Sequence, residues 1–400
     1  CLFVFSPFIS RVLAPTYSLD LRNNLSHKIK ILSFALIFIV EMAVYNSLLK
    51  ANERFIPGEF VAVNQSIILI LLIILLGKNI GPNILVIGFL AYALINLIYL
   101  MVCSRNMWRI TSGNPFLDDS VKKLLIMMCP LLLGYSMIFV NQQIDKIIVS
   151  GLGEGIISAM GYAAVLSNFI ATFVGSVCGV SFTYITQRIT EGNDEEAAQL
   201  SNNSAIQLVT LLLPISVLTI INANDIVTVL FGRGKFDNIA IQNCSLALIG
   251  YGFMFVPYVF RELFSRFQYG YGDSKRPMFN SAISIVINII LSVLLSRVWG
   301  VLGVTLATSI SVFVCAILNV FTSIRKNNYL KSRDYFKQLP RWICGLLVCL
   351  VASILCKNIL VNVHVLIRLA VIVLLSLSLY LLITFPVLLP LFKVILNKRK

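Results

Sequence analysis

The sequence predicts an all-α membrane protein that crosses the bilayer many times. Of its 400 residues, 58% are hydrophobic and only 12% are charged, whereas soluble domains carry about 25% charged residues. The apolar residues gather in long unbroken runs, unlike the short alternating strands of an outer-membrane barrel. Many of these runs approach or exceed the roughly 20 residues that a helix needs to cross a bilayer. The composition therefore excludes an ordinary soluble domain and a disordered chain.

The apolar runs divide the chain into about eleven full spans and one N-terminal stub. The stub, residues 1–10, resembles the last turns of a helix, and the chain begins with Cys1 inside an apolar run. We therefore expect a fragment that starts within a helix. The expected full spans are residues 28–50, 60–77, 82–103, 121–150, 157–187, 203–222, 239–267, 277–297, 300–324, 340–361 and 364–395.

Lysine and arginine are unequally divided between alternate loops. The richer set includes the loop from Arg325 to Arg341 and the tail from Lys398 to Lys400. Basic loops favour the cytoplasmic side, so we expect the C-terminus to face the cytoplasm. The basic first loop, residues 11–30, is an exception that this rule does not explain. The net charge of +15 is thus interpreted as membrane topology and an anionic substrate, and no nucleic-acid partner is expected.

Metal-dependent and covalent catalysis are not expected from the residues present. The nine cysteines lie mostly in apolar runs without a CxxC pair, and His27 and His364 are the only imidazoles. No loop offers the paired carboxylates or histidine that sugar transfer would need. The sequence therefore predicts a protein that is not an enzyme.

An internal repeat links the two halves of the chain. Residues 51–75 resemble residues 271–295, with Pro57 corresponding to Pro277, an offset of 220 residues (277 − 57). In both copies an acidic and basic loop precedes a proline in the first helical turn, where its missing N–H costs nothing. Chance similarity between two apolar helices is the alternative. Parallel repeats are a common transporter plan, with the substrate cavity between them, so we expect a pseudo-twofold, two-lobed fold.

Several motifs in a fixed order resemble one family of exporters. They are NQQIDKIIVSGLGEGIISAMGYAAVLSNF (141–169), ITEGNDEEAAQLSN (189–202), VTVLFGRGKFDNIAI (227–241), FQYGYGDSKRPMFNSAISIVINI (267–289) and WGVLGVTLATSIS (299–311). Together they are similar to the MurJ/MviN lipid II flippases of the multidrug/oligosaccharidyl-lipid/polysaccharide exporter superfamily. The resemblance extends to about residue 325 and continues more weakly through the last two helices.

The resemblance implies a domain organisation. Residues 1–118 would be the remainder of the N-terminal lobe, from the end of the third helix to the sixth. Residues 119–326 would form the C-terminal lobe, from the seventh helix to the twelfth. Residues 338–397 would be the last two helices, which form a groove for a lipid tail. The family exports by alternating access, through a cationic cavity that accepts a pyrophosphate and sugar headgroup.

Asp145 is the first candidate site residue. A charge at mid-membrane costs roughly 2.5–3.5 kcal/mol on insertion scales, so it suggests function. Asp145 lies beside Lys146, and a neutralised pair near the interface is the alternative. The resemblance implies a sodium site, with sodium as the coupling ion and no other cofactor. The residues that it assigns to this site are Asp145, Asn288, Ser292, the carbonyl of Val304, and Thr308. Ser292 stands where relatives can carry a second carboxylate, which implies weaker ion binding.

Candidates for the substrate cavity are fewer than in the family. The family pattern in the eighth helix carries an arginine where this chain has Val165, three residues after Tyr162. Arg261, one turn from Arg266, is the best intramembrane cation that remains, although a structural pair with Glu262 or Glu41 would also explain it. Three further candidates are the basic loop residues Arg54, Lys275 and Arg276. A headgroup that arrives from the cytoplasm would meet them first. Alternatively, they only set the membrane topology.

These observations predict a flippase in the bacterial inner membrane that moves an undecaprenyl-pyrophosphate-linked peptidoglycan precursor outward. Its partners would be that precursor, membrane lipids and cell-wall synthesis proteins. A flippase for another lipid-linked oligosaccharide, of O-antigen or capsule type, is the nearest alternative because of Val165. A non-transporting membrane scaffold of envelope assembly is an alternative from a different class.

Overall fold

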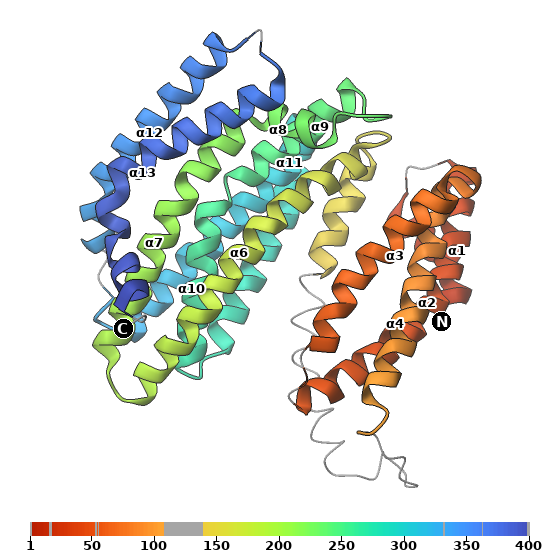
Figure 1. Ribbon diagram of the computed structural model, residues 1–400, viewed down its shortest axis with the longest axis horizontal. Coiled ribbons are helices and arrows are strands. Elements are labelled where there is room, and N and C mark those ends of the chain that lie inside the picture. Colours follow the sequence, from red (N-terminus) through yellow and green to blue (C-terminus); the bar gives the residue numbers. More distant parts are fainter. Residues whose placement is uncertain are drawn as a thin grey trace. The chain divides into compact units, whose positions relative to one another are not determined.

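The protein folds as two helical units in a computed structural model that describes residues 2–15, 18–52, 54, 56–107, 139–330, 333–361 and 363–397 (Figure 1). All regular elements within these ranges are helices, which confirms the all-α class. The two compact units are Cys1–Pro130 and Leu131–Lys400. The predicted lobe boundary at residues 118–119 lies outside the described ranges.

The described residues of the first unit form four α-helices and a small apolar core. They are α1 (Leu2–Leu13), α2 (Leu19–Ala51), α3 (Ile56–Ile80) and α4 (Ile84–Ser104), with the 3-10 turn η1 (Gly81–Asn83) between the last two. Helix α4 packs against both α2 and α3. Buried Met42, Leu49 and Leu100 contribute to the core that joins these helices.

The second unit contains the remaining helices. Residues 139–150 are helical and precede α6 (Ile156–Thr190), α7 (Asp194–Ile221), α8 (Ala223–Phe231), α9 (Asn238–Gly252), α10 (Phe255–Gly270), α11 (Lys275–Lys326), α12 (Arg333–Ile359) and α13 (Val365–Asn397). Helix α6 packs on α7, α9 and α10, and the α12–α13 pair packs on α7. The last two helices, which the sequence sets apart, are thus attached to the second unit.

Helix starts follow local capping rules. The side chain of Asn193 accepts a hydrogen bond from the backbone N–H of Glu196 (3.3 Å), and three acidic residues follow in the first turn of α7. The Asp237 carboxylate accepts from the backbone N–H of Ala240 (2.8 Å) at the start of α9. Carboxylates and amide oxygens satisfy the free N–H groups of a first turn, and negative charge there complements the helix dipole.

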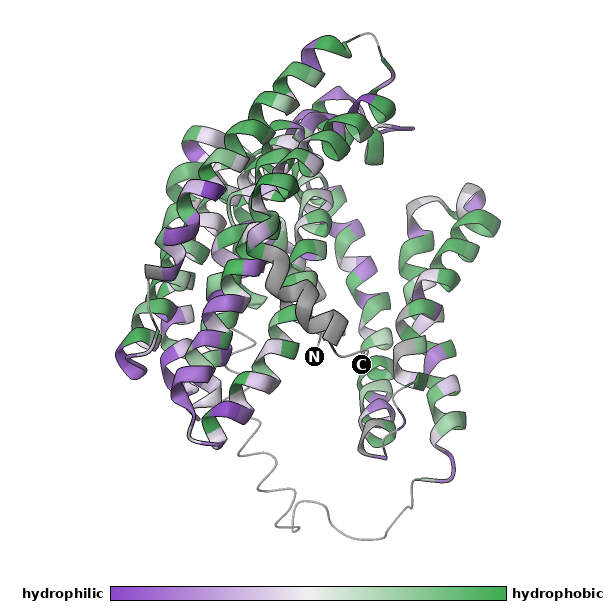
Figure 2. Ribbon diagram, turned by 60° about the vertical axis from the view of Figure 1, so that its left-hand side comes forward, coloured by the Kyte–Doolittle hydropathy of each residue, from purple (hydrophilic) through white to green (hydrophobic). Residues whose placement is uncertain are grey.

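Apolar side chains face outward along the helices. Ile74, Phe169 and Leu382 are 71%, 75% and 73% exposed, and Figure 2 shows the hydrophobic colour along much of the helices and the hydrophilic colour concentrated towards many of their ends. Eight helices among the described residues are long and apolar enough to cross a membrane, or nine with the bent pair α9–α10. The chain is therefore a multi-pass membrane protein.

Two differences separate these helices from the predicted spans. The predicted span 239–267 is broken between α9 and α10, which meet at 45°. The 52-residue α11 covers two predicted spans, 277–297 and 300–324, because it reverses direction at Gly300 (φ 56°, ψ −132°). The predicted span 121–150 is described only from residue 139 onward.

The internal repeat recurs in the contacts between helices. In the second unit, the Asn280 side chain donates to Asn319 (2.8 Å) across the two halves of α11. In the first unit, the rings of Phe60 and Tyr99 meet with centroids 5.6 Å apart across α3 and α4. Phe60 precedes Asn280 by 220 positions (280 − 60), and Tyr99 precedes Asn319 by the same number (319 − 99). The two hairpins therefore share one register, although one contact is polar and the other aromatic.

Candidate functional site

A buried polar cluster surrounds Asp145. The Ser292 hydroxyl lies 2.9 Å from Oδ1 of Asp145 and 3.0 Å from Oδ1 of Asn288. The Asn288 amide donates to the Thr308 hydroxyl (3.2 Å), which in turn donates to the carbonyl of Val304 (3.2 Å). The structure thus brings together all five residues that the resemblance assigned to an ion site. We call them the Asp145 cluster.

The turn at Gly300 builds most of this cluster. Asn288 and Ser292 are one turn apart on the first half of α11, and Val304 and Thr308 are one turn apart on the second half. Because the halves run antiparallel, their polar faces meet, and the helical segment 139–150 adds Asp145 from the side. Asp145 is 8% exposed, so its charge depends on these neighbours.

The donor set of the Asp145 cluster fits a hard monovalent cation. Its ligand atoms would be oxygens from one carboxylate, hydroxyls, an amide and a carbonyl, which are the ligand types that such ions prefer. Within the described part of the chain, no group of three or more His, Cys, Asp or Glu side chains lies close enough together to bind a transition metal. A single carboxylate matches a single positive charge.

A second charged group lies on α10. The Glu262 carboxylate pairs with Arg266 at 2.7 Å, one helical turn away. Gly179 of α6 leaves room for the guanidinium, since a Cβ there would lie 2.9 Å from its Nη1. The guanidinium of Arg261 lies over the ring of Tyr258, 5.6 Å from its centroid. Glu262 therefore neutralises Arg266, and Arg261 has no ion-pair partner among the residues that the structure describes.

Three further residues were considered for the substrate cavity: Tyr162 and Val165 on α6, and Arg54 in the first unit. Tyr162 on α6 packs against the rings of Phe231 and Phe236, with centroids 4.9 and 5.4 Å away. Val165, in place of the family's arginine, is 62% exposed on the same helix. Arg54 is exposed between α2 and α3 in the first unit.

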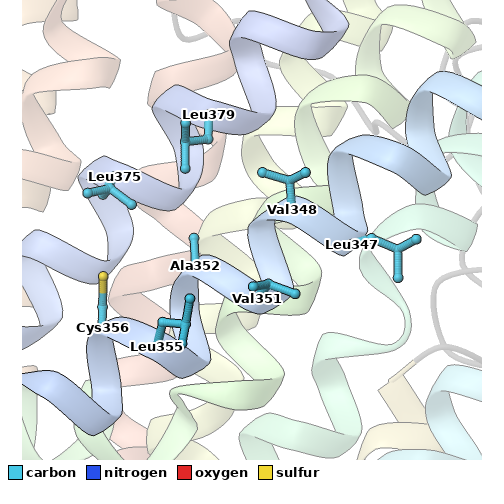
Figure 3. Close-up of a pocket in the computed structure, with 8 residues that line it drawn as sticks. All are labelled: Leu347, Val348, Val351, Ala352, Leu355, Cys356, Leu375 and Leu379. Carbon is cyan, nitrogen blue, oxygen red and sulfur yellow. The ribbon is translucent and has the colours of Figure 1, made fainter.

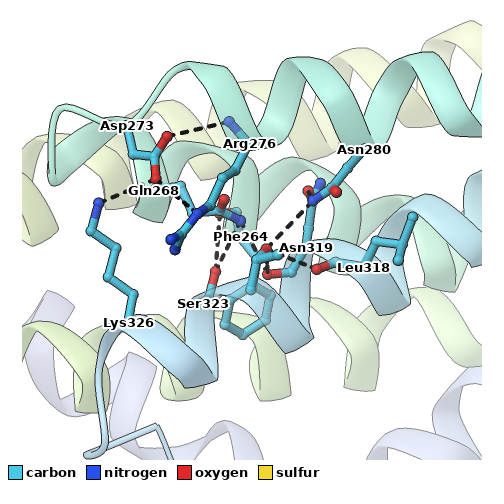
Figure 4. Close-up of polar contacts among 10 residues, drawn as sticks. Phe264, Gln268, Asp273, Arg276, Asn280, Leu318, Asn319, Ser323 and Lys326 are labelled. Carbon is cyan, nitrogen blue, oxygen red and sulfur yellow. Dashed lines mark hydrogen bonds and ion pairs between the residues drawn. The ribbon is translucent and has the colours of Figure 1, made fainter.

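Lys275 and Arg276 begin α11 beside an acidic loop residue. Both are exposed, and Asp273 lies 3.5 Å from Arg276 and 3.4 Å from Lys326 (Figure 4). Partial burial alone would raise the pKa of Asp273, but the backbone N–H of Arg276 and the Lys326 ammonium outweigh burial and lower it. Arg276 is therefore partly neutralised, while Lys275 has no ion-pair partner in the described residues.

A buried amide network lies next to that loop (Figure 4). Gln268 of α10 donates to the carbonyl of Asn319 (3.1 Å) and to the Ser323 hydroxyl (3.2 Å). Asn319 also donates to Ser265 (2.8 Å). These bonds join α10 to the second half of α11 in a setting where a bilayer offers no water to replace them.

An apolar groove runs between α12 and α13 (Figure 3). Its volume is about 430 Å³, within the usual size of small-molecule sites. All eight side chains that line it are apolar or a cysteine: Leu347, Val348, Val351, Ala352, Leu355, Cys356, Leu375 and Leu379. Such a groove suits a hydrocarbon chain and offers no group to a charged ligand.

The structure contains an intramembrane ion pair that the sequence analysis did not predict. Arg368 of α13 and Asp225 of α8 meet at 2.8 Å, with side chains only 15% and 8% exposed. The signal was available, because Arg368 stands in a long apolar run and intramembrane charge suggests function.

A family model and the curated relatives indicate the same protein family. A family model described as lipid II flippase MurJ matches residues 1–375. The chain is 26% identical over 290 residues to a probable lipid II flippase MurJ of Rickettsia prowazekii, covering 69% of this chain and 55% of the relative. It is 29% identical to one of Rhizobium tropici, covering 54% and 40%. The chain spans about half the length of these curated relatives.

Solved structures show the same fold. A lipid II flippase MurJ in an inward closed conformation superposes with a TM-score of 0.81 at 20% identity, covering 98% of this chain and 80% of that one. An inward-facing multidrug resistance MATE family transporter gives a TM-score of 0.68 at 12% identity, covering 82% and 78%. The exporter fold expected from the sequence is thereby confirmed.

Proposed function

Because the chain belongs to the MurJ lipid II flippase family, we propose that it exports an undecaprenyl-pyrophosphate-linked peptidoglycan precursor across the bacterial inner membrane. The family match over residues 1–375 is the observation that carries this proposal. Transport of this kind forms and breaks no covalent bond, so the protein is no enzyme. The C-terminus would face the cytoplasm, as the basic loops indicate.

The physical task is to move a charged headgroup past hydrocarbon. A pyrophosphate does not cross an apolar layer unaided, whereas guanidinium groups bind phosphate oxygens through a planar fork. In the second unit, Arg261 lies within α10, and no carboxylate neutralises its guanidinium within the described residues. Arg261 is therefore our choice for a headgroup contact. Arg266 is held by Glu262 and would act by positioning.

The groove between α12 and α13 would hold the polyprenyl tail. Its lining is wholly apolar (Figure 3), and a hydrocarbon chain lying there gains contacts without requiring a polar partner. The tail could thus stay in an apolar environment while the headgroup moves.

Filling this groove tests the assignment. We expect Ala352→Phe to reduce transport of a long-tailed substrate more than tenfold, because each displaced methylene forfeits about 0.8 kcal/mol and about 1.4 kcal/mol is tenfold in affinity. Flipping in proteoliposomes measures this. Ile354→Phe, on the same helix but outside the groove, is the matched control and should transport normally. Equal transport activity of the two variants would show that the tail does not lie in this groove.

The Asp145 cluster would hold sodium as the coupling ion. Asp145 would supply the charge, and the side-chain oxygens of Asn288, Ser292 and Thr308 and the carbonyl of Val304 the remaining ligands. A bound sodium ion supplies a positive charge that neutralises Asp145. Because the ligands come from segment 139–150 and from both halves of α11, ion binding would draw these three helical segments together.

A flippase for another lipid-linked oligosaccharide is the second candidate. Val165, exposed on α6 in place of the family's arginine, favours it, since a different headgroup would need different cations. Complementation separates the two candidates. The gene that encodes this chain should restore growth to bacteria depleted of their lipid II flippase, whereas an empty vector should not. Failure there, together with rescue of a capsule-export mutant, would assign the protein to the second candidate.

A further inference from the structure

Polar contacts attach the α12–α13 pair to α7 and α8 along its length. Two lie on the body of α7. The Tyr335 hydroxyl donates to Asn202 (2.9 Å), and the Trp342 indole N–H donates to Thr210 (2.8 Å). Both acceptors are buried. Because hydrogen bonds of buried groups are not exchanged for water within a membrane, each contact fixes the position of α12 on α7.

Two further contacts lie at the junction of α7 and α8. The Asn222 amide donates to the Ser353 hydroxyl of α12 (3.2 Å), and Arg368 of α13 donates to Asp225 (2.8 Å). From Asn202 to Asn222 a helix extends about 30 Å, at about 1.5 Å per residue. The four contacts therefore span the thickness of a bilayer core and oppose both sliding and rotation of the pair.

The ion pair depends on its two members. The bond joins Nη2 of Arg368 to Oδ1 of Asp225, whereas Nε of Arg368 and Oδ2 of Asp225 are buried and have no hydrogen-bond partner in the described structure. Each charge therefore has one direct partner. Loss of either side chain would leave the other charge buried and uncompensated, which is strongly unfavourable.

Helix α8 connects this junction to the surroundings of the Asp145 cluster. Asp225 and Asn222 face α13 and α12, whereas Ala223 and Val227 are buried in the same apolar core as Val304. Val304 supplies the carbonyl of the Asp145 cluster. One short helix thus touches the groove-bearing pair on one side and the core beside the candidate ion site on the other.

We propose that Asp225 and Arg368 are positioning residues that hold the α12–α13 groove on the second unit, so that the groove moves with that unit as one body during transport. The inference rests on the proposed function for its transport consequence. Its structural content, a fixed attachment through α8, stands on the contacts alone.

Covalent fixation gives the first test. In a variant without native cysteines, Asn222→Cys and Ser353→Cys are joined by an oxidant or a short bifunctional thiol reagent. We expect efficient cross-linking and transport within about twofold of the reduced protein, because residues that already move together lose nothing by being joined. Loss of transport that reduction restores would overturn the proposal, and so would the absence of any cross-link in the intact protein.

Charge exchange gives the second test. Arg368→Asp and Asp225→Arg should each reduce flipping of a long-tailed substrate more than tenfold and that of a short-tailed analogue less than threefold. The double variant should recover most of the long-tailed activity. Lys337→Gln, which breaks the exposed Lys337–Asp334 pair on α12 (3.1 Å), should change neither. Equal loss for both substrates in the single variants, or no recovery in the double variant, would contradict a positioning role.

The cross-linking and charge-exchange experiments distinguish a failure of this inference from a failure of the proposed function. If the wild-type protein moves neither substrate, the flippase proposal fails. The attachment is then judged by the Asn222–Ser353 cross-link and by thermal unfolding. The double charge exchange should melt at a higher temperature than either single variant if the pair fixes α13 on α8, and no higher if it does not.

Discussion

Gly303→Ala should strongly destabilise the second unit. A Cβ at residue 303 would collide with the backbone carbonyl of Leu295 and lie 2.9 Å from the nitrogen of Ser296. Because these are backbone atoms, no side-chain rotation relieves the clash, and the two halves of α11 must separate. We expect a loss of about 3 kcal/mol or more and a Tm lower by roughly 10 °C, measured by thermal unfolding in detergent.

A second glycine provides the control for that experiment. Gly161 lies within α6, and a Cβ there meets no atom within 4 Å. Gly161→Ala should leave the Tm unchanged or raise it slightly, since alanine is favoured over glycine in a helix by about 0.5–1 kcal/mol. If Gly303→Ala melts like Gly161→Ala, the α11 halves do not meet at Gly303 and Leu295 as described.

Asp145→Asn is expected to abolish stabilisation by sodium. A ligand at a hundred times its Kd stabilises the state that binds it by about 2.7 kcal/mol. The wild-type Tm should therefore rise by several degrees in a sodium titration at constant ionic strength. The asparagine variant keeps the shape of the side chain but supplies no charge, so its Tm should not respond. This measurement needs no substrate and no transport.

Matched variants make the sodium result specific. Asp334→Asn removes an exposed carboxylate near the start of α12 and should leave the sodium response intact. Ser292→Asp places a second carboxylate beside the first, where the serine hydroxyl now lies 2.9 Å from Asp145, so it should make the response stronger. A wild-type Tm that is the same in sodium and choline chloride would exclude a sodium site at Asp145.

The helices were largely predictable, but their breaks were not. Apolar runs identify the helices because hydrophobicity along the chain is enough to place them in a bilayer. The same measure cannot tell one long span from α9 and α10, which are both apolar and bend at Phe253 and Met254. Pro257, in the first turn of α10, was the available signal, since proline favours the start of a helix.

The polar partners were predictable only in part. The motif that contains Asp145 nominated the Asp145 cluster through a resemblance. For the charges on α10, proximity in sequence suggested Arg261 with Glu262, whereas the structure pairs Glu262 with Arg266. A spacing of four residues places two side chains on one face of a helix, while adjacent residues point apart.

By itself, the sequence determined a membrane-embedded helical protein with two related halves, because burial of apolar side chains is non-directional and depends on the local run of residues. The local sequence does not specify which polar groups meet. A resemblance implied the Asp145 cluster, and only tertiary structure brings its members, and the Asp225–Arg368 pair, into contact. Asp145 and Ser292 are 147 positions apart, and Asp225 and Arg368 are 143 apart. Hydrogen bonds and ion pairs act over about 3 Å in fixed directions, so the first pair requires the turn at Gly300 and the second requires the packing of α13 on α8.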